Sequence, residues 1–252
     1  MMISLYTAAA GMSAQQFHID TISHNLANIN TTAFKRVRAE FQDLIYLPIY
    51  RPTAYDAIGL DVGLGVCPTA SYTIFEQGSI QQTENPLDLS LSGPGFFVVR
   101  GPGGEIYYTR DGSFKLDAAG NLVTSDGYRV EIEGAQQFPG TENIIFSQDG
   151  RISYLDAEGN EIFLGRLVIA QFDNPAGLEK VGRNLYRSSP ASGDARISNA
   201  GVTVNQYSLE GSNVQVVDEM IRLITAQRTY ELNSKAVQAS DEMLSIINNL
   251  RR

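Results

Sequence analysis

The side chains that could do chemistry are few, and they do not form a set with a known reaction. The two histidines are His18 and His24, six residues apart in a segment with helical periodicity. At about 100° per residue they point about 120° apart, so they cannot readily share a metal ion. We interpret both as surface histidines.

The single cysteine, Cys67, has no histidine at the spacing of a catalytic pair, and we interpret it as an incidental thiol. Carboxylates occur in Asp111-Gly112-Ser113 and Asp149-Gly150, but such dipeptides are typical of turns. Gly93-Pro94-Gly95 precedes an expected strand and lacks the lysine of a phosphate loop. The sequence therefore predicts no enzyme, no metal site and no cofactor.

Charge, hydropathy and the first residues of the chain argue against further classes of protein. The 252 residues carry a formal net charge of -9, which argues against nucleic acid because phosphate binding needs concentrated Lys and Arg. No apolar run approaches the ~20 residues of a membrane span, so we expect no membrane insertion. The first residues lack the basic region of a secretion signal, and we expect no cleaved signal peptide.

The elements that organise the chain are its two ends. From Glu210 to Leu250 there is no Pro, and no Gly after Gly211. Ser212 and Gln215 have the spacing of a capping box, which predicts a helix start. The apolar residues then repeat at steps of three and four, with one slip through Arg228, as in a coiled-coil seam. This C-terminal seam consists of Val217, Ile221, Ile224, Leu232, Ala236, Ala239, Met243, Ile246 and Leu250.

Residues 1–29 are predicted to form the first helix, with a similar seam in which only Gln15 is polar. This N-terminal seam consists of Leu5, Ala8, Met12, Ile19, Ile22, Leu26 and Ile29. We predict that the two helices pair as a coiled coil and that the seams form subunit interfaces. The alternative is that each helix packs on a globular core.

The middle of the chain alternates with period two from Val66 onward, which predicts strands. Turn signals at Asp111-Gly112, Asp126-Gly127 and Asp149-Gly150 predict hairpins, and residues 116–123 resemble 155–162. We therefore expect an α+β fold with a mostly antiparallel β middle, either a small barrel or a sandwich.

The expected domains are a helical one (1–46 plus 205–252), a connector loop or arm (47–65) and a β-rich outer domain (66–204). Residues 34–46 form a short second helix or an extended arm. Their basic cluster, Lys35, Arg36 and Arg38, is a solvated face or a contact with an acidic surface of a neighbouring copy.

Four motifs resemble those of the bacterial flagellar rod and hook proteins, in the order of the chain. The N-terminal one is Asn25-Leu26-Ala27-Asn28-Ile29-Asn30-Thr31-Thr32-Ala33-Phe34-Lys35-Arg36. The C-terminal one is Ala226-Gln227-Arg228-Thr229-Tyr230-Glu231-Leu232-Asn233-Ser234-Lys235-Ala236-Val237. Between them lie Leu91-Ser92-Gly93-Pro94-Gly95-Phe96-Phe97 and Tyr108-Thr109-Arg110-Asp111-Gly112-Ser113-Phe114.

The resemblance implies a structural subunit that self-assembles into a helical tube and transmits torque from the flagellar motor for motility. It implies terminal helices in an inner tube, a place in the distal part of the rod, and a periplasmic location reached through the flagellar export apparatus. The implied partners are other copies, proximal rod and hook subunits, and the rings of the basal body. Two alternatives stay open: a proximal rod subunit or paralogue, and a β-domain ligand-binding module dimerised by its helices.

Overall fold

A computed structural model describes residues 2–50, 60–134, 137–138, 140, 144–156 and 160–250. The chain divides into two compact units. The first unit contains Met1–Ala27, Val37–Thr73 and Gln215–Arg252, and the second contains Asn28–Arg36 and Ile74–Val214. The chain therefore passes between the units at four points, after Ala27, Arg36, Thr73 and Val214. The sequence analysis placed its boundaries elsewhere, near residues 46, 65 and 204.

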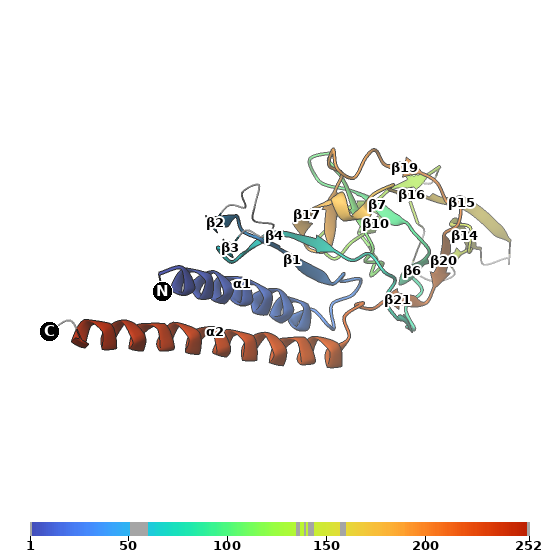
Figure 1. Cartoon of the computed structure of the whole chain (residues 1–252). Coiled ribbons are helices and arrows are strands. Elements are labelled where there is room, and N and C mark those ends of the chain that lie inside the picture. The colour runs from blue at the N-terminus through green and yellow to red at the C-terminus, as the bar shows by residue number, and fades with distance from the viewer. Residues whose placement is uncertain are drawn as a thin grey trace. The chain divides into compact units, whose positions relative to one another are not determined.

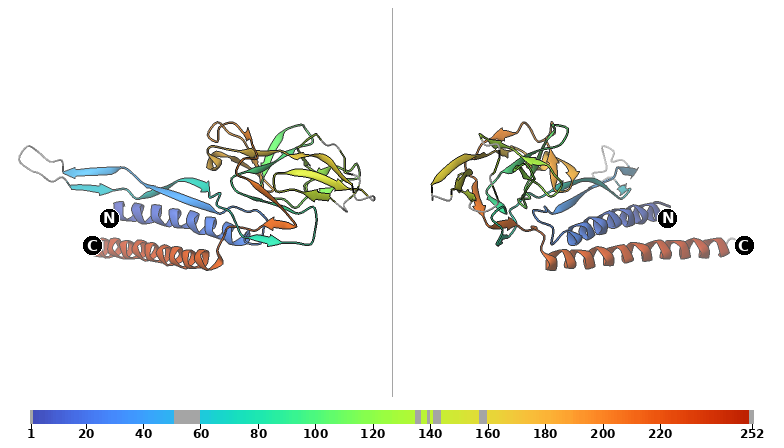
Figure 2. Two further views of the ribbon diagram at one scale, coloured as in Figure 1. Left: turned by 90° about the vertical axis from the view of Figure 1, so that its right-hand side faces the viewer. Right: turned by 180° about the vertical axis from the view of Figure 1, so that it is seen from behind.

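The first unit is built on two antiparallel helices, α1 (Met2–Ala27) and α2 (Val216–Leu250). A long antiparallel ribbon of β1 (Val37–Asp43) and β4 (Val66–Thr73) lies along α1 on the side away from α2 (Figures 1 and 2). The extended alternative for residues 34–46 is thus confirmed for the part that forms β1. It is extended because each residue of β1 has a partner in β4.

Two further strands, β2 (Tyr46–Tyr50) and β3 (Leu60–Gly63), pair with each other where the sequence analysis expects an irregular connector. Residues 51–59 of that connector lie outside the described residues. Pro48 is tolerated because a two-stranded ribbon has free edges, where a missing N–H costs no ladder bond.

The second unit contains short antiparallel strands in two sheets and two smaller pairs. The nine-stranded sheet holds β7 (Phe96–Arg100), β8 (Ile106–Thr109), β9 (Lys115–Leu116), β10 (Leu122–Val123), β11 (Arg129–Val130), β16 (Ile169–Gln171), β17 (Glu179–Gly182), β18 (Leu185–Arg187) and β19 (Arg196–Ile197). The four-stranded sheet holds β12 (Ile132–Glu133), β13 (Ile144–Phe146), β14 (Arg151–Leu155) and β15 (Glu161–Leu167). The pairs are β6 (Leu89–Ser92) with β20 (Thr203–Gln206) and β5 (Ile80–Gln82) with β21 (Ser208–Glu210), and η1 (Pro175–Gly177) is a single 3₁₀ turn. The predicted antiparallel β middle is confirmed.

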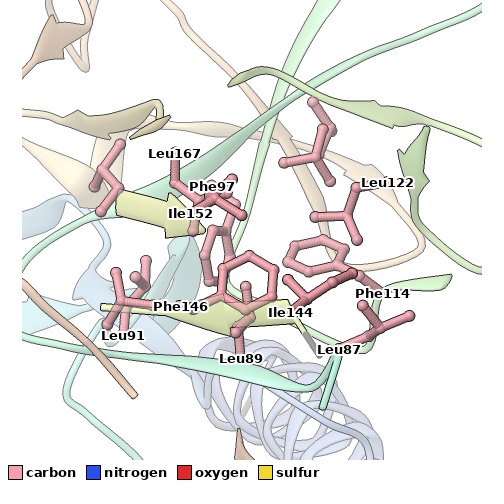
Figure 3. Close-up of a cluster of buried hydrophobic side chains, with 14 of the residues drawn as sticks. Leu87, Leu89, Leu91, Phe97, Phe114, Leu122, Ile144, Phe146, Ile152 and Leu167 are labelled. Carbon is pink, nitrogen blue, oxygen red and sulfur yellow. The ribbon is translucent and has the colours of Figure 1, made fainter. Parts of the chain in front are cut away.

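The core of the second unit collects apolar side chains from both sheets and from β6 (Figure 3). Phe97 of β7 meets Phe114 edge to face, with ring centroids 5.0 Å apart. Ile152 and Ile144 come from the four-stranded sheet and are buried in the same cluster. Each fully buried side chain of this kind contributes about 1.5–3 kcal/mol, so this unit has its own core.

Glycine turns close most of the predicted hairpins. Gly127 joins β10 to β11 and Gly150 joins β13 to β14, each with positive φ. The two similar segments also match, because Asp117 N–H donates to Asn121 O and Asp156 N–H donates to Asn160 O, both at 3.0 Å. The hairpin expected at Gly112 is wrong. A Cβ there would stand 1.7 Å from Leu89 O, so this glycine serves a close approach between backbones.

Candidate assembly surface

The helix α2 packs against α1 through a face that mixes aliphatic, small and polar residues. Glu219, Ala226 and Ser240 are buried on this face, and Leu223, Asn233, Val237 and Leu244 are half-buried. This face lies close to Gly11 of α1, where an added Cβ would stand 2.9 Å from Asn233 Nδ2. We call this the inner face of α2.

The predicted C-terminal seam lies on the opposite side of α2, which we call the outer face. Val217 is 69% exposed, Ile221 58%, Leu232 65% and Ile246 58%. Ile224, Met243, Ala236 and Ala239 are exposed as well, and the side chain of Leu250 lies outside the described residues. The two terminal helices pair, but the expectation that this seam packs on α1 within one chain is wrong. The physical reason is that Asn233 of the inner face lies against Gly11 of α1, where there is no space for an added Cβ.

The N-terminal seam is more covered. Ala8 and Ile22 are buried, and Leu5, Met12, Ile19 and Leu26 are half-buried. Ile29 does not belong to the stripe, because α1 ends at Ala27 and Ile29 follows in a turn.

Asn25 is buried near the end of α1 and forms hydrogen bonds to the two other elements that pack there, β1 and α2. Its Nδ2 donates to Val37 O at 2.8 Å and to Glu219 Oε2 at 3.2 Å. Its Oδ1 accepts from Val37 N–H at 2.9 Å. The amide thus joins α1 to β1 and to α2, and all its hydrogen-bonding capacity toward these neighbours is used.

A buried charge cluster lies in the second unit. Lys35 Nζ meets Glu210 Oε1 at 2.5 Å, and both side chains are 0% exposed. Arg110 approaches the other carboxylate oxygen at 3.4 Å and donates to Gly93 O at 2.7 Å. Lys35 also donates to Glu76 O at 2.7 Å. Burial lowers the pKa of Lys35 and of Arg110, and the Glu210 carboxylate opposes both shifts.

Lys35 therefore belongs neither to a solvated face nor to a contact with another copy, and both alternatives for it are wrong. Arg36 is half-buried and Arg38 is exposed, with Arg38 3.8 Å from Glu40. The lysine is drawn inward because it precedes β1 at a point where the chain lies beside Glu210: Ala33 N–H donates to Glu210 O at 2.7 Å.

Asn213 joins three segments of the second unit that the chain brings from distant parts of the sequence. Its Oδ1 accepts from Arg36 N–H at 2.7 Å. Its Nδ2 donates to Ile74 O at 2.9 Å and to Glu76 O at 3.2 Å. These bonds explain why α2 begins at Val216 and not at the expected cap, Ser212, since residue 213 is held outside a helix.

Glu210, Arg110 and Asn213 were not predicted as functional residues. Arg110 falls within a motif of the resemblance, whereas Glu210 and Asn213 are single residues beside Gly211. A carboxylate directly before the turn into a predicted helix was the one available signal. Of the terminal motifs, Phe34 is buried, Asn28 and Ser234 are half-buried, and Tyr230 and Lys235 are exposed.

The residues first considered for chemistry are explained by packing. His18 contacts Phe41 edge to face, with centroids 5.8 Å apart, and His24 is exposed. Gln42 Nε2 donates to Cys67 Sγ at 3.6 Å, and Asp111 accepts from the backbone and hydroxyl of Ser113. Among the described residues, no three His, Cys, Asp or Glu side chains are placed to hold a metal ion. None of the described helices is long and apolar enough to cross a membrane.

A ligand-binding module would need a pocket with converging polar groups. A hollow of about 490 Å³ lies over β10 and β11 and is lined by Arg100, Asn121, Arg129 and Glu131, among others. Two of its charges already pair with each other, since Arg100 Nη2 lies 2.9 Å from Glu131 Oε1. The hollow offers little unpaired charge for a ligand.

Three families match successive parts of the chain. "Flagella basal body rod protein" matches residues 5–35, "Flagellar hook protein FlgE/F/G D1 domain" matches 90–154, and "Flagellar basal body rod FlgEFG protein C-terminal" matches 205–250. The first and last contain α1 and α2, and the second contains part of the β core.

Whole proteins are similar as well. The flagellar basal-body rod protein FlgG of Borreliella burgdorferi is 44% identical over 265 residues, with all of both chains covered. FlgG of Caulobacter vibrioides is 40% identical, with 99% of this chain and 100% of the other covered. FlgG of Buchnera aphidicola subsp. Schizaphis graminum is 39% identical with the same coverage. These similarities do not favour a ligand-binding module. The chain belongs to the flagellar basal-body rod protein family, in which it groups with the distal rod protein FlgG, and it is a structural subunit of the flagellar basal-body rod.

Proposed function

We propose that the subunit polymerises into a helical tube through the outer face of α2, and that this tube carries motor torque toward the hook and filament. The observation that carries the proposal is the exposure of that face. A helix of 35 residues presents Val217, Ile221, Ile224, Leu232, Met243 and Ile246 to solvent. Exposed apolar surface on this scale is typical of an interaction site.

Further copies of the same chain are the occupants that fit this face. The seam repeats every three or four residues, so it suits another helix with the same repeat. Each fully buried Leu, Ile or Met contributes about 1.5–3 kcal/mol. A contact between different faces of successive copies generates a helical filament when its rotation does not close into a ring.

Torque transmission follows from many such contacts acting in parallel, since shearing the tube would expose the seams of many copies together. The same proposal places the polymer in the periplasmic part of the basal body, between proximal rod and hook subunits and inside the rings. It includes passage through the flagellar export apparatus with α1 retained, because removing α1 would expose the inner face of α2. The intact mass of subunits taken from assembled rods tests that retention.

Negative-stain electron microscopy of the concentrated full-length chain tests the assembly surface. The wild-type chain should form straight tubes of uniform width. Ile221→Asp and Ile246→Asp should abolish them, because each places a charge in the seam that becomes buried on assembly. The matched controls are Gln227→Asp and Gln238→Asp, which place the same charge at exposed polar positions of α2 and should leave the tubes intact.

Circular dichroism verifies that the variants keep the fold of the wild-type chain. Normal tubes from the two isoleucine variants would refute the seam. Isolated basal bodies lacking outer rod segments serve as templates when the free chain stays monomeric. If the wild-type chain forms tubes neither alone nor on these templates, polymerisation through α2 is wrong.

A further inference from the structure

The helix α1 could pack against either of two faces of α2, the inner face or the outer face. The outer face carries more large apolar residues, including Ile221 and Ile224. The inner face combines Leu223, Val237 and Leu244 with the polar residues Glu219, Asn233 and Ser240. Ile221 and Ile224 lie about 200° and 140° around the helix from Glu219. Burial of apolar area alone favours the outer face, yet the inner face is the one that packs on α1.

The distinguishing feature of the inner face is a buried hydrogen bond. Asn25 Nδ2 donates to Glu219 Oε2 at 3.2 Å, and both side chains are almost fully buried, with exposures of 2% and 1%. The bond joins residues that are far apart in sequence. It can form only when the inner face of α2 is turned toward the end of α1.

The orientation of the Asn25 amide is fixed by its hydrogen bonds to Val37 of β1, independently of α2. Its Oδ1 accepts from Val37 N–H, and one Nδ2 hydrogen goes to Val37 O. With the backbone of β1 holding these two positions, the remaining Nδ2 hydrogen is directed at α2. The donor that selects a partner on α2 is thus preorganised.

We propose that the Asn25–Glu219 hydrogen bond selects the inner face of α2 for packing within the chain, and so keeps the apolar outer face available to a second copy. A half-turn of α2 would bring Ile221 or Ile224 toward Asn25 and leave the buried N–H without an acceptor. Such an unsatisfied group costs more than a typical hydrogen bond contributes. A single buried asparagine specifies helix register in coiled coils by the same principle.

A second contact reinforces the choice. The approach of Gly11 to Asn233 leaves no room for a Cβ without displacing the amide, since the distance would be 2.9 Å. Lys235 lies two residues after Asn233, as Ile221 lies two residues after Glu219, and it is exposed. The same half-turn would bring its longer side chain toward Gly11 and separate the helices at this point.

This inference rests on the proposed function, because it explains how the assembly surface stays free before assembly. It is tested on the monomer, at concentrations below assembly, so that it can fail independently. Cys67 is the only cysteine, so Cys67→Ser provides a background for engineered disulfides. Gly11→Cys with Asn233→Cys reports the observed pairing, and Gly11→Cys with Lys235→Cys reports the turned helix.

The double variant Asn25→Leu/Glu219→Leu removes the selecting bond, and Glu219→Gln retains an acceptor at the same position. With wild-type residues at 25 and 219, oxidation should link 11 to 233. In the double leucine variant this yield should fall about tenfold or more, as expected for loss of a buried hydrogen bond to a charged group. The 11–235 link should rise and tube formation should decline, whereas Glu219→Gln should behave as wild type in both assays.

The selection is refuted if the double leucine variant keeps the 11–233 link and assembles normally. It is also refuted if that variant forms neither link, because the bond would then be needed for stability and not for choice. A wild-type chain that links 11 to 233 but never polymerises would overturn the proposed function while leaving the selection of the inner face in place.

Discussion

Gly11 of α1 and Asn233 of α2 lie in close contact, with an added Cβ on Gly11 falling 2.9 Å from Asn233 Nδ2. The neighbour is the end of a flexible side chain, so it can yield to a small group. A larger group would have to move the helix itself. Substitutions of increasing size at Gly11 therefore test how tightly the inner face of α2 packs against α1.

Gly11→Ala should be close to neutral, because the displaced amide is offset by the helix propensity of alanine, about 1 kcal/mol better than glycine. Gly11→Val should cost about 1–3 kcal/mol through overpacking. Adding Asn233→Ala to the valine variant should recover part of that loss. Thermal unfolding followed by far-UV circular dichroism measures all three. Equal melting temperatures for the alanine and valine variants would contradict the close approach.

The charge cluster of Glu210, Lys35 and Arg110 makes a second prediction. Glu210→Leu would leave two buried cations without their carboxylate and should cost about 3–5 kcal/mol. Lys35→Met should cost less, because Arg110 still pairs with Glu210. Urea unfolding is followed by tyrosine fluorescence, since the chain has 12 Tyr and no Trp.

The matched control is Glu179→Leu. Its ion pair with Arg187 has a similar length, 2.8 Å, but the two side chains are 55% and 51% exposed. Exposed pairs contribute about 0–1 kcal/mol. If Glu179→Leu and Glu210→Leu shift the urea midpoint equally, the buried cluster does not stabilise the second unit.

Local patterns predicted much of this fold because they depend on neighbouring residues. The periodicity of residues 1–29 and 210–250 predicted both helices, and Asp126-Gly127 and Asp149-Gly150 predicted real hairpins. The prediction at Gly112 failed because the requirement there comes from Leu89, which the chain places against it. A glycine needed for contact with a distant backbone resembles a turn glycine in sequence.

The pairing of the seams was beyond prediction for a similar reason. Ile221 and Glu219 are two residues apart, and apolar content made the face of Ile221 the obvious partner for α1. The deciding bond joins Glu219 to Asn25, so it is visible only once the helices are placed. Likewise, the burial of Lys35 depends on Glu210, far along the chain. Long-range polar pairs leave no periodic signal.

His18 gives the first unit a predicted pH dependence. Burial lowers its pKa, Arg222 adds to that shift, and Glu219 opposes it. When the pKa of a histidine is lower in the folded state than in the unfolded state, the unfolded state binds the proton more tightly, so protonation favours unfolding. The stability that it contributes is therefore fully present above the unfolded value of about 6.5 and is lost as the pH falls through the window below it.

The melting temperature of the wild-type chain should decline between about pH 7 and pH 5, and His18→Gln should flatten that slope. His24→Gln, which alters the exposed histidine of the same helix, should leave the slope unchanged. A slope that persists in His18→Gln would assign it to other groups.

Asn213 holds Arg36, Ile74 and Glu76 together through one amide. Arg36, Ile74 and Asn213 itself stand beside three of the four points where the chain passes between the two units. Asn213→Ala should leave the Arg36 N–H and two carbonyls without this partner, at about 1–3 kcal/mol for each group that stays unsatisfied. Hydrogen exchange at Arg36 should accelerate. Asn174→Ala, which removes an exposed bond to Ala191 O, is the control and should not affect Arg36.

Asn213→Asp tests the acceptor and the donor group of the Asn213 side chain separately. A carboxylate can still accept from Arg36 N–H, but it cannot donate to the carbonyl oxygens of Ile74 and Glu76 and would repel them. We expect Arg36 to stay protected in Asn213→Asp while the segment at Ile74 loosens and its amide exchanges faster, since Ile74 N–H donates to Arg36 O at 2.9 Å. Equal protection at both residues in the aspartate variant would show that Asn213 holds a single segment. Protection lost at Arg36 but kept at Ile74 would reverse the assigned orientation of the amide.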